Sequence, residues 1–138
     1  MEDYNGELIR LADQARSLSY APYSGYTVGA ALATEDGEIF LGANVENASY
    51  GATVCAERAA IYQAIIAGKR KFKKIAVVGG RAGEAAATLF CPCGICRQVM
   101  AEFCADDFEI ITASKDERLT ATLGEALPSG FGKDAMRK

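Results

Sequence analysis

The spacing of apolar residues predicts alternating helices and strands along the chain. Apolar side chains recur at helical spacing over residues 8–18, and the Pro, Ser and Gly within residues 22–25 end this first helix. Residues 26–34 and 38–43 read as two antiparallel strands joined by a turn at Asp36-Gly37. A helix followed by a strand pair is therefore expected in the first third of the chain.

The remaining two thirds continue the alternation. A helix is expected from about Cys55 to Ala67, ending at Gly68, and another over residues 94–104. The continuous apolar run at residues 75–78 is typical of a central strand covered on both faces. Further strands are expected at 109–113 and 118–123. Helices interspersed with buried strands predict a layered α/β domain.

Composition narrows the class of protein. The 138 residues suit one domain spanning 1–138, and a hydrophobic content of 50% argues against disorder. A net charge of -3 argues against a nucleic-acid partner, and the basic run at residues 69–74 reads as a solvated helix end. The start of the chain does not resemble a secretory signal, and no apolar run is long enough for a membrane span. Five unevenly spaced cysteines predict free thiols in a reducing, cytoplasmic setting.

Two short motifs predict a metal centre in this histidine-free chain: Cys55-Ala56-Glu57 and Pro92-Cys93-Gly94-Ile95-Cys96. Cys93 and Cys96 fall on one face of a starting helix, and Cys55 lies at the start of another. Helix amino termini help thiols to ionise, so all three positions suit thiolate ligands. Three thiolates can bind one zinc ion and leave its fourth position open, which favours hydrolysis over a structural role.

Several residues around these motifs have more than one interpretation. Glu57 is either a proton-handling carboxylate or an acid favoured by the first-turn dipole, and we favour the first. Arg58 is either a donor of hydrogen bonds to the ligand sulfurs, which would withdraw negative charge, or a surface residue. Cys91 could compete with Cys93 for the metal, but the extended approach to Pro92 favours Cys93. Cys104 shares a helical face with apolar residues and is expected to pack in the core.

The motif set resembles the zinc-dependent nucleoside deaminases, and specifically the small homotetrameric cytidine deaminases. The matching segments occur in order over nearly the whole chain. They are Tyr20-Ala21-Pro22-Tyr23-Ser24, Val28-Gly29-Ala30-Ala31-Leu32, Gly42-Ala43-Asn44-Val45-Glu46-Asn47-Ala48, Cys55-Ala56-Glu57-Arg58, Pro92-Cys93-Gly94-Ile95-Cys96-Arg97-Gln98 and Leu127-Pro128-Ser129-Gly130-Phe131.

The resemblance implies both a fold and a reaction. The fold is a three-layer α/β/α sandwich with a mixed, roughly five-stranded sheet, and Cys55, Cys93 and Cys96 hold one Zn²⁺ per subunit. Glu57 deprotonates zinc-bound water, which attacks C4 of cytosine, and then passes protons to N3 and to the departing ammonia. The products are uridine and 2'-deoxyuridine, which places the enzyme in pyrimidine salvage.

The resemblance also implies how substrate is bound in a homotetramer. Asn44 and Glu46 read the sugar hydroxyls, and Phe131 from a neighbouring subunit stacks over the pyrimidine. Ala48, Tyr50, Ala56 and Tyr26 complete the expected substrate contacts, with Ala48 and Tyr50 in an inter-subunit region. Tyr26 stands where the family has phenylalanine, and its hydroxyl needs a partner.

Four other functions compete with this interpretation. A deaminase of a cytosine-containing antibiotic such as blasticidin S shares the zinc motifs, but Asn44 and Glu46 favour a plain nucleoside. A thiol redox protein would use Cys93 and Cys96 and leave Cys55 and Glu57 unexplained. A structural zinc module would need a fourth protein ligand, for which only Cys91, Cys104 or a carboxylate is available. Nucleic-acid-editing relatives usually carry a histidine ligand and a basic surface, and this sequence has neither.

Overall fold

Five strands form one sheet in the computed structural model, which describes residues 3–133. The longest helix within these residues has 12 residues, and none is long and apolar enough to cross a membrane. The elements are α1 (Tyr4–Ala15), β1 (Tyr26–Thr34), β2 (Ile39–Ala43), α2 (Ala56–Ile66), β3 (Phe72–Arg81), α3 (Gly94–Phe103), β4 (Glu109–Ala113), β5 (Arg118–Thr122) and α4 (Leu123–Ala126), with short 3₁₀ helices at Arg16–Leu18 and Tyr50–Ala52.

The sheet is mixed, with the strand order β2-β1-β3-β4-β5. β1 is antiparallel to both β2 and β3, β4 is parallel to β3, and β5 is antiparallel to β4. The parallel pair requires a crossover connection, and α3 supplies it. This crossover places α3 on the same face of the sheet as α2, so residues at the start of α3 lie close to α2.

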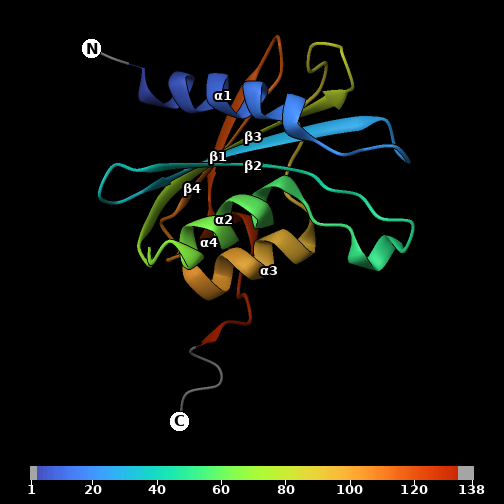
Figure 1. The fold of residues 1–138 in the computed structure, drawn as a ribbon. Coiled ribbons are helices and arrows are strands. Elements are labelled where there is room, and N and C mark those ends of the chain that lie inside the picture. Colours follow the sequence, from blue (N-terminus) through green and yellow to red (C-terminus); the bar gives the residue numbers. More distant parts are fainter. Residues whose placement is uncertain (1–2, 134–138) are drawn as a thin grey trace.

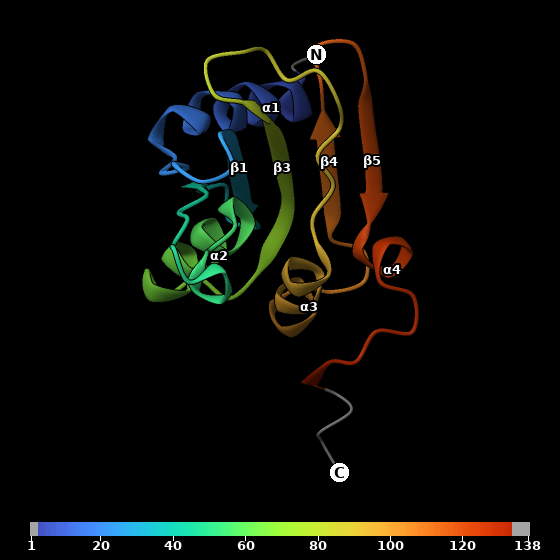
Figure 2. The same ribbon diagram turned by 90° about the vertical axis from the view of Figure 1, so that its right-hand side faces the viewer.

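Helices cover both faces of the sheet (Figure 1). α1 packs on one face, where Leu8 and Ala12 contact the side chains of Ala31 and Ala33. On the other face α3 lies between α2 and α4 (Figure 2), and the core there includes the alternate β1 residue Leu32. Successive residues of β1 thus enter opposite cores, as expected for a strand buried on both faces. The predicted α/β/α sandwich with a mixed five-stranded sheet is confirmed.

Three elements differ from the sequence prediction. α1 begins four residues earlier than its first apolar position, because the Asp3 side chain accepts a hydrogen bond from the Gly6 N–H at 3.0 Å. β3 spans Phe72–Arg81 and so continues through Gly79, beyond the run at residues 75–78 that predicted it. A Cβ there would lie 2.7 Å from the ring of Phe90, so glycine allows this close packing. α4 was not predicted, although Thr122 and Glu125 form a capping box at its start.

The basic run after α2 is largely paired. Lys69 forms ion pairs with Asp36 at 2.8 Å and Glu38 at 2.6 Å. The Arg70 guanidinium donates a hydrogen bond to the Ile65 carbonyl oxygen at 2.8 Å, in the last turn of α2. Arg70 therefore bonds the carboxyl end of α2, as the sequence indicates, whereas Lys69 pairs with carboxylates at the turn between β1 and β2.

Close packing of β2 against α2 depends on Gly42, and this leads to a stability prediction. A Cβ at Gly42 would lie 2.3 Å from the Ala56 carbonyl oxygen and 2.5 Å from the Ala60 nitrogen, both backbone atoms. Gly42→Ala is therefore expected to lower the free energy of unfolding by about 3 kcal/mol, because α2 must move away from the sheet. Thermal unfolding measures this loss. Gly51→Ala is the matched control, since a Cβ there meets nothing within 4 Å; equal melting temperatures of the two variants would contradict the prediction.

Candidate active site and metal centre

Three thiols meet where α2 and α3 begin. Cys55 is the N-cap residue of α2, Cys93 is the N-cap residue of α3, and Cys96 lies buried in the first turn of α3. The Sγ atoms are 3.9 Å apart between Cys55 and Cys93 and 3.5 Å apart between Cys93 and Cys96. All three lie within 4.8 Å of one another, and we call them the thiol cluster. Two helices that follow different strands thus deliver ligands to one point.

The thiol cluster has the dimensions of a zinc site. Zinc–sulfur bonds of about 2.3 Å in a tetrahedron place ligand sulfurs about 3.8 Å apart, close to the distances found here. Within residues 3–133 no fourth His, Cys, Asp or Glu joins the cluster. Cys91 is exposed and outside it, and Cys104 packs against the core, where burial raises its pKa to about 12. The donor set therefore fits a zinc ion that keeps one position open.

The surroundings of the thiol cluster favour ionisation of Cys55, which shares a proton with Cys96. Hydrogen bonding with the Cys96 thiol and with the Arg58 guanidinium lowers the pKa of Cys55 to about 5. The same hydrogen bond between the Cys55 and Cys96 side chains, together with burial, raises the pKa of Cys96. Arg58 donates to the Cys55 Sγ at 3.4 Å and to the Thr53 carbonyl oxygen at 3.2 Å, while its buried Nε has no hydrogen-bond partner among residues 3–133. Arg58 therefore lies where it can withdraw negative charge from the sulfurs.

Glu57 is a buried carboxyl group beside the thiols. It lies in the first turn of α2 with 4% of its surface exposed. Burial, assisted by the negative charge of Cys55, raises its pKa to about 7. A carboxyl group in this environment can both accept and return a proton near neutral pH. It also reaches the wall of an open cavity, so a bound molecule has access to it.

A cavity of about 390 Å³ opens in front of the cysteines. Its volume is within the range of small-molecule sites. Its walls come from β1, from the loops after β2 and β3, and from the start of α2. The lining residues are Ser24, Tyr26, Val28, Asn44, Glu46, Thr53, Cys55, Ala56, Glu57, Phe90, Cys91 and Cys93. Of the residues predicted to bind substrate, the structure places Tyr26, Asn44, Glu46 and Ala56 in this wall.

Asn44 and Glu46 are hydrogen-bonded within the chain as well as lining the cavity. The Asn44 amide accepts from the Val28 N–H at 2.9 Å and donates to the Tyr26 carbonyl oxygen at 3.0 Å. Glu46 accepts from the backbone N–H groups of Tyr23 and Ser24, both at 3.0 Å, and from the Ser24 hydroxyl. Both side chains are therefore held in fixed orientations. An amide with a second N–H and a carboxylate with further lone pairs retain capacity for a ligand.

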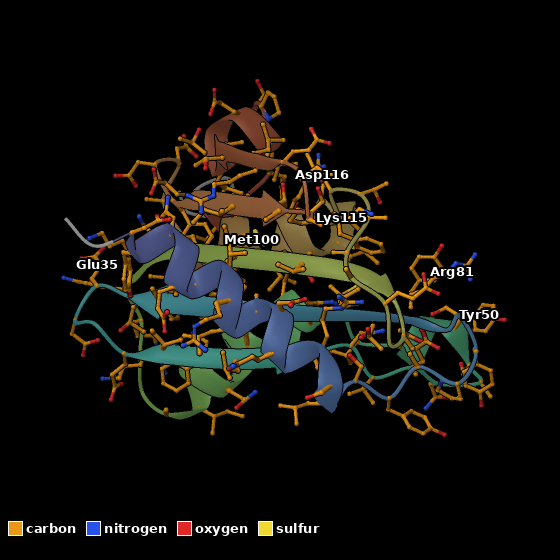
Figure 3. The ribbon with its side chains drawn as sticks, turned by 90° about the horizontal axis from the view of Figure 1, so that it is seen from above. Glu35, Tyr50, Arg81, Met100, Lys115 and Asp116 are labelled. Atoms are coloured by element: carbon orange, nitrogen blue, oxygen red, sulfur yellow. The ribbon has the colours of Figure 1, made fainter. Side chains whose placement is uncertain are left out.

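The other three predicted substrate contacts lie outside the cavity wall. Tyr50 is 78% exposed and lines a neighbouring hollow, with its ring centroid 6.5 Å from that of Tyr23. Figure 3 shows Tyr50 and Arg81 at the same end of the molecule, opposite Glu35. Ala48 is exposed in the adjoining loop, and Phe131 is 61% exposed beyond α4. Within the described residues these three side chains therefore do not belong to the wall of the cavity.

The sequence did not indicate four of the lining residues: Ser24, Val28, Thr53 and Phe90. The ring centroid of Phe90 lies 6.1 Å from that of Tyr26, and the Arg81 guanidinium lies 5.2 Å from the Tyr26 ring. Val28 was detectable, because it shares a strand face with Tyr26 two residues away. Phe90 comes from an irregular loop, where residue spacing predicts no direction for the side chain.

The chain is similar to known deaminases over most of its length. The sequence profile described as "Cytidine and deoxycytidylate deaminase zinc-binding region" matches residues 3–112. A cytidine deaminase of Sporosarcina psychrophila is 43% identical over 131 residues, which cover 94% of this chain and 93% of that protein. A cytidine deaminase of Halalkalibacterium halodurans is 44% identical over 130 residues, covering 94% of this chain and 95% of the other.

A solved structure agrees with the sequence matches. The crystal structure of cytidine deaminase from Burkholderia pseudomallei has 44% identity and a TM-score of 0.84, covering 95% of this chain and all of that one (100%). The profile match includes all three clustered thiols and Glu57. A profile match over most of the chain and relatives above 40% identity are decisive together: the chain belongs to the cytidine and deoxycytidylate deaminase family.

Proposed function

We propose that the protein hydrolyses cytidine and 2'-deoxycytidine to uridine and 2'-deoxyuridine with release of ammonia. The observation that carries this proposal is the buried carboxyl group of Glu57 beside three clustered thiols, at the wall of a cavity of nucleoside size. The reaction consumes one water and exchanges the amino group at C4 of cytosine for oxygen. It is the activity named for the relatives that this chain resembles.

The metal requirement is a single zinc ion held by Cys55, Cys93 and Cys96. Zinc bound there supplies Lewis-acid chemistry that makes water acidic enough to lose a proton near neutral pH. Three thiolates carry more negative charge than zinc neutralises, which would weaken this effect. The Arg58 guanidinium, 3.4 Å from the Cys55 sulfur, offsets part of that excess.

Glu57 moves the protons of the reaction. Its carboxylate accepts a proton from the attacking water, and the resulting carboxylic acid donates it to N3 of the ring. The second proton of that water reaches the amino group by the same route, so that ammonia departs and the carbonyl forms. Burial suits Glu57 to this exchange, because the free energies of its charged and neutral forms become similar.

The cavity wall provides the substrate contacts. Asn44 and Glu46 bind the sugar hydroxyls through hydrogen-bonding capacity that their bonds to the chain leave free. The Tyr26 ring and Ala56 contact the pyrimidine. The Asn44 and Glu46 pair favours a nucleoside over a cytosine-containing antibiotic. The thiol redox alternative does not account for Glu57 or for Cys55 in the cluster.

The active protein is a homotetramer in the cytoplasm, formed by one catalytic domain per chain over residues 1–138 and serving pyrimidine salvage. Phe131 of a neighbouring subunit closes the cavity over the base, with Tyr50 and Ala48 at the contact between subunits. Support comes from the exposure of these residues: Phe131 and Tyr50 are 61% and 78% exposed, so both rings are accessible to a neighbouring subunit.

Removal of the Phe131 ring is predicted to weaken substrate binding. Phe131→Ala should raise KM for cytidine about tenfold with a smaller change in kcat, because stacking on a base contributes about 1–3 kcal/mol. Steady-state kinetics on the tetramer measures this. Ile66→Ala is a suitable control, since Ile66 is also exposed but lies at the far end of α2. An unchanged KM would exclude stacking by Phe131.

Ammonia release from cytidine by the purified, zinc-loaded protein tests the proposal directly. Equal amounts of ammonia and uridine are expected from cytidine, and of ammonia and 2'-deoxyuridine from 2'-deoxycytidine. Blasticidin S is assayed in parallel. Turnover of blasticidin S without turnover of either nucleoside would establish the antibiotic-type deaminase instead.

A further inference from the structure

Two adjacent side chains of α3 hold the segment that carries Phe131. This segment, residues 127–133, follows α4 and is called the tail here. The Gln98 amide donates to the Phe131 carbonyl oxygen at 2.6 Å. The Arg97 guanidinium donates to the Ala126 carbonyl oxygen at 3.0 Å and to the Pro92 carbonyl oxygen at 2.9 Å. α3 is thus hydrogen-bonded to the last residue of α4, just before the tail, and to the tail itself at Phe131.

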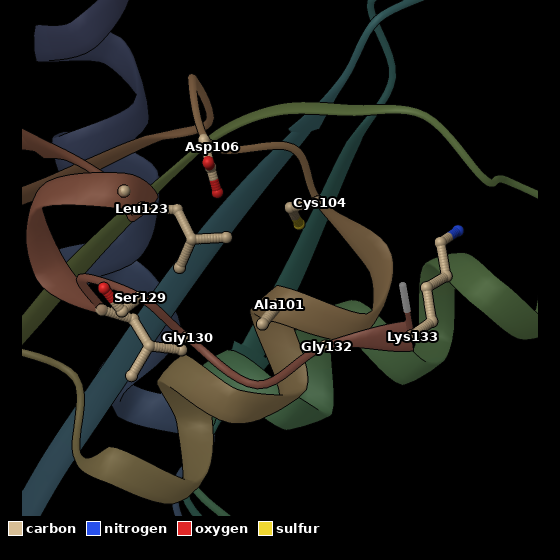
Figure 4. Close-up of a pocket in the computed structure, with 10 residues that line it drawn as sticks. Ala101, Cys104, Asp106, Leu123, Ser129, Gly130, Gly132 and Lys133 are labelled. Atoms are coloured by element: carbon tan, nitrogen blue, oxygen red, sulfur yellow. The ribbon is translucent and has the colours of Figure 1, made fainter. Parts of the chain in front are cut away.

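The tail crosses a hollow rather than packing closely on the helix. A cavity of about 350 Å³ lies between the tail and the end of α3 (Figure 4). Ser129, Gly130 and Gly132 line it from the tail, and Ala101 and Cys104 line it from the α3 side. Leu127, at the start of the tail, packs against the core, but residues 128–131 are exposed, so dispersion contacts hold that part of the tail weakly. The hydrogen bond from Gln98 to Phe131 therefore contributes a large share of the placement of this part.

The Phe131 ring does not anchor itself on its own subunit. It is 61% exposed, so its position follows from the position of its backbone. The bond from Gln98 reaches that backbone at the Phe131 carbonyl. Ser129, two residues earlier, has a positive φ of 54°, which turns the chain just before this point. The direction in which the ring projects thus depends on a turn and on one side-chain hydrogen bond.

We propose that Gln98 is a positioning residue, which with Arg97 fixes the tail so that Phe131 projects into the active site of a neighbouring subunit. The inference rests on the proposed stacking role of Phe131. The same helix, α3, serves both the metal centre and the tail. Its N-cap residue is the clustered thiol Cys93, and its residue Gln98 bonds the Phe131 backbone. Arg97 also links the tail side of α3 to the metal centre, because its guanidinium donates to the carbonyl oxygen of Pro92, the residue before Cys93. α3 thereby positions metal ligands in its own subunit and, through Phe131, the aromatic ring that covers the active site of a neighbouring subunit.

The kinetic test is a double-mutant cycle with cytidine as substrate. Gln98→Ala should raise KM about fivefold, which corresponds to one neutral hydrogen bond, with kcat and zinc content unchanged. In a Phe131→Ala background the same substitution should change KM no further, because Gln98 acts through Phe131. A simple loss of stability would instead raise KM equally in both backgrounds, and that result would overturn the inference.

Two further variants make the cycle specific. Gln98→Glu keeps the shape of the side chain but replaces the N–H donor, and it should reproduce the Gln98→Ala effect. Gln63→Ala is the matched control, because the Gln63 amide also donates from an exposed helix position to a backbone carbonyl, that of Leu41, at 2.7 Å. An equal rise in KM for Gln63→Ala would show a general effect and overturn the inference.

A spectroscopic measurement separates failure of the inference from failure of the proposed function. The chain contains no tryptophan, so Phe131→Trp introduces a single fluorescent reporter in the tail. Adding Gln98→Ala should lower its fluorescence anisotropy, and unchanged anisotropy overturns the positioning role of Gln98. If Phe131→Ala leaves KM unchanged while Gln98→Ala still lowers the anisotropy, the stacking role of Phe131 is wrong and the holding role of Gln98 stands.

Discussion

Glu57→Ala is expected to lower kcat for cytidine by roughly 10²–10⁴-fold, the range attributed to general acid–base catalysis, or more if no water replaces the carboxylate. The side chain is buried at the cavity wall, and no other carboxylate joins the described thiol cluster. The other carboxylate of the wall, Glu46, is held by hydrogen bonds from Tyr23 and Ser24, so we expect no neighbouring acid to take over the protons of Glu57. Zinc content should stay at one per subunit, because Glu57 is not one of the clustered ligands. Steady-state kinetics and elemental analysis of the same preparation measure both quantities.

Two comparison variants sharpen the Glu57 prediction. Glu57→Gln preserves the volume of the side chain but cannot carry a proton, so its loss of kcat should match that of Glu57→Ala. Glu102→Ala removes an exposed glutamate from α3 and should leave kcat unchanged. Substantial activity in both Glu57 variants, with zinc retained, would remove this residue from the mechanism.

Cys93→Ala is expected to abolish both zinc binding and turnover. The Cys93 sulfur is 3.9 Å from that of Cys55 and 3.5 Å from that of Cys96, so its removal leaves only two ligands. Two thiolates rarely retain zinc against dilution, since zinc sites in proteins normally supply three or four ligands. Zinc per subunit, measured after gel filtration in metal-free buffer, should fall from one to nearly zero.

Cys91 is the informative comparison for the Cys93 prediction. Cys91 lies two residues away and is exposed outside the thiol cluster, so Cys91→Ala should retain one zinc per subunit. Cys104→Ala should also retain zinc, with a modest loss of stability from the core. Loss of zinc from Cys91→Ala together with retention in Cys93→Ala would reverse the ligand assignment.

The sequence pattern was most reliable where one interaction dominates. The β1 strand was predicted with its observed bounds, because an unbroken run of small and apolar residues is buried on both faces. The pattern was least reliable where contacts between residues distant in the chain determine the bounds of an element. β3 extends through Gly79 because this residue pairs with Val28 of β1, and the missing Cβ leaves room for the ring of Phe90, which is distant in the chain. No local propensity reports such a contact.

For the site, motif spacing identified the thiols and Glu57, while their meeting depends on the topology. The sequence places Cys55 and Cys93 at two helix starts, but only the crossover between the parallel strands β3 and β4 brings α3 beside α2. The sequence also did not predict the hydrogen bonds of the Asn44 side chain, because they join its amide to residues of β1 that lie much earlier in the chain. Residue types therefore predicted the chemistry of the site, but not the distances and contacts between its residues.

The sequence by itself determined the five strands, the helices α1, α2 and α3, and which side chains could hold a metal or move a proton. These properties depend on residue type and on neighbours within a few positions, through periodicity, capping and ionisation. Only the tertiary structure decided that Phe90 and Arg81 flank Tyr26, and that Gln98 holds the Phe131 backbone across a hollow. Such contacts join residues far apart in the chain, and their free energy depends on packing and distance that no local pattern contains.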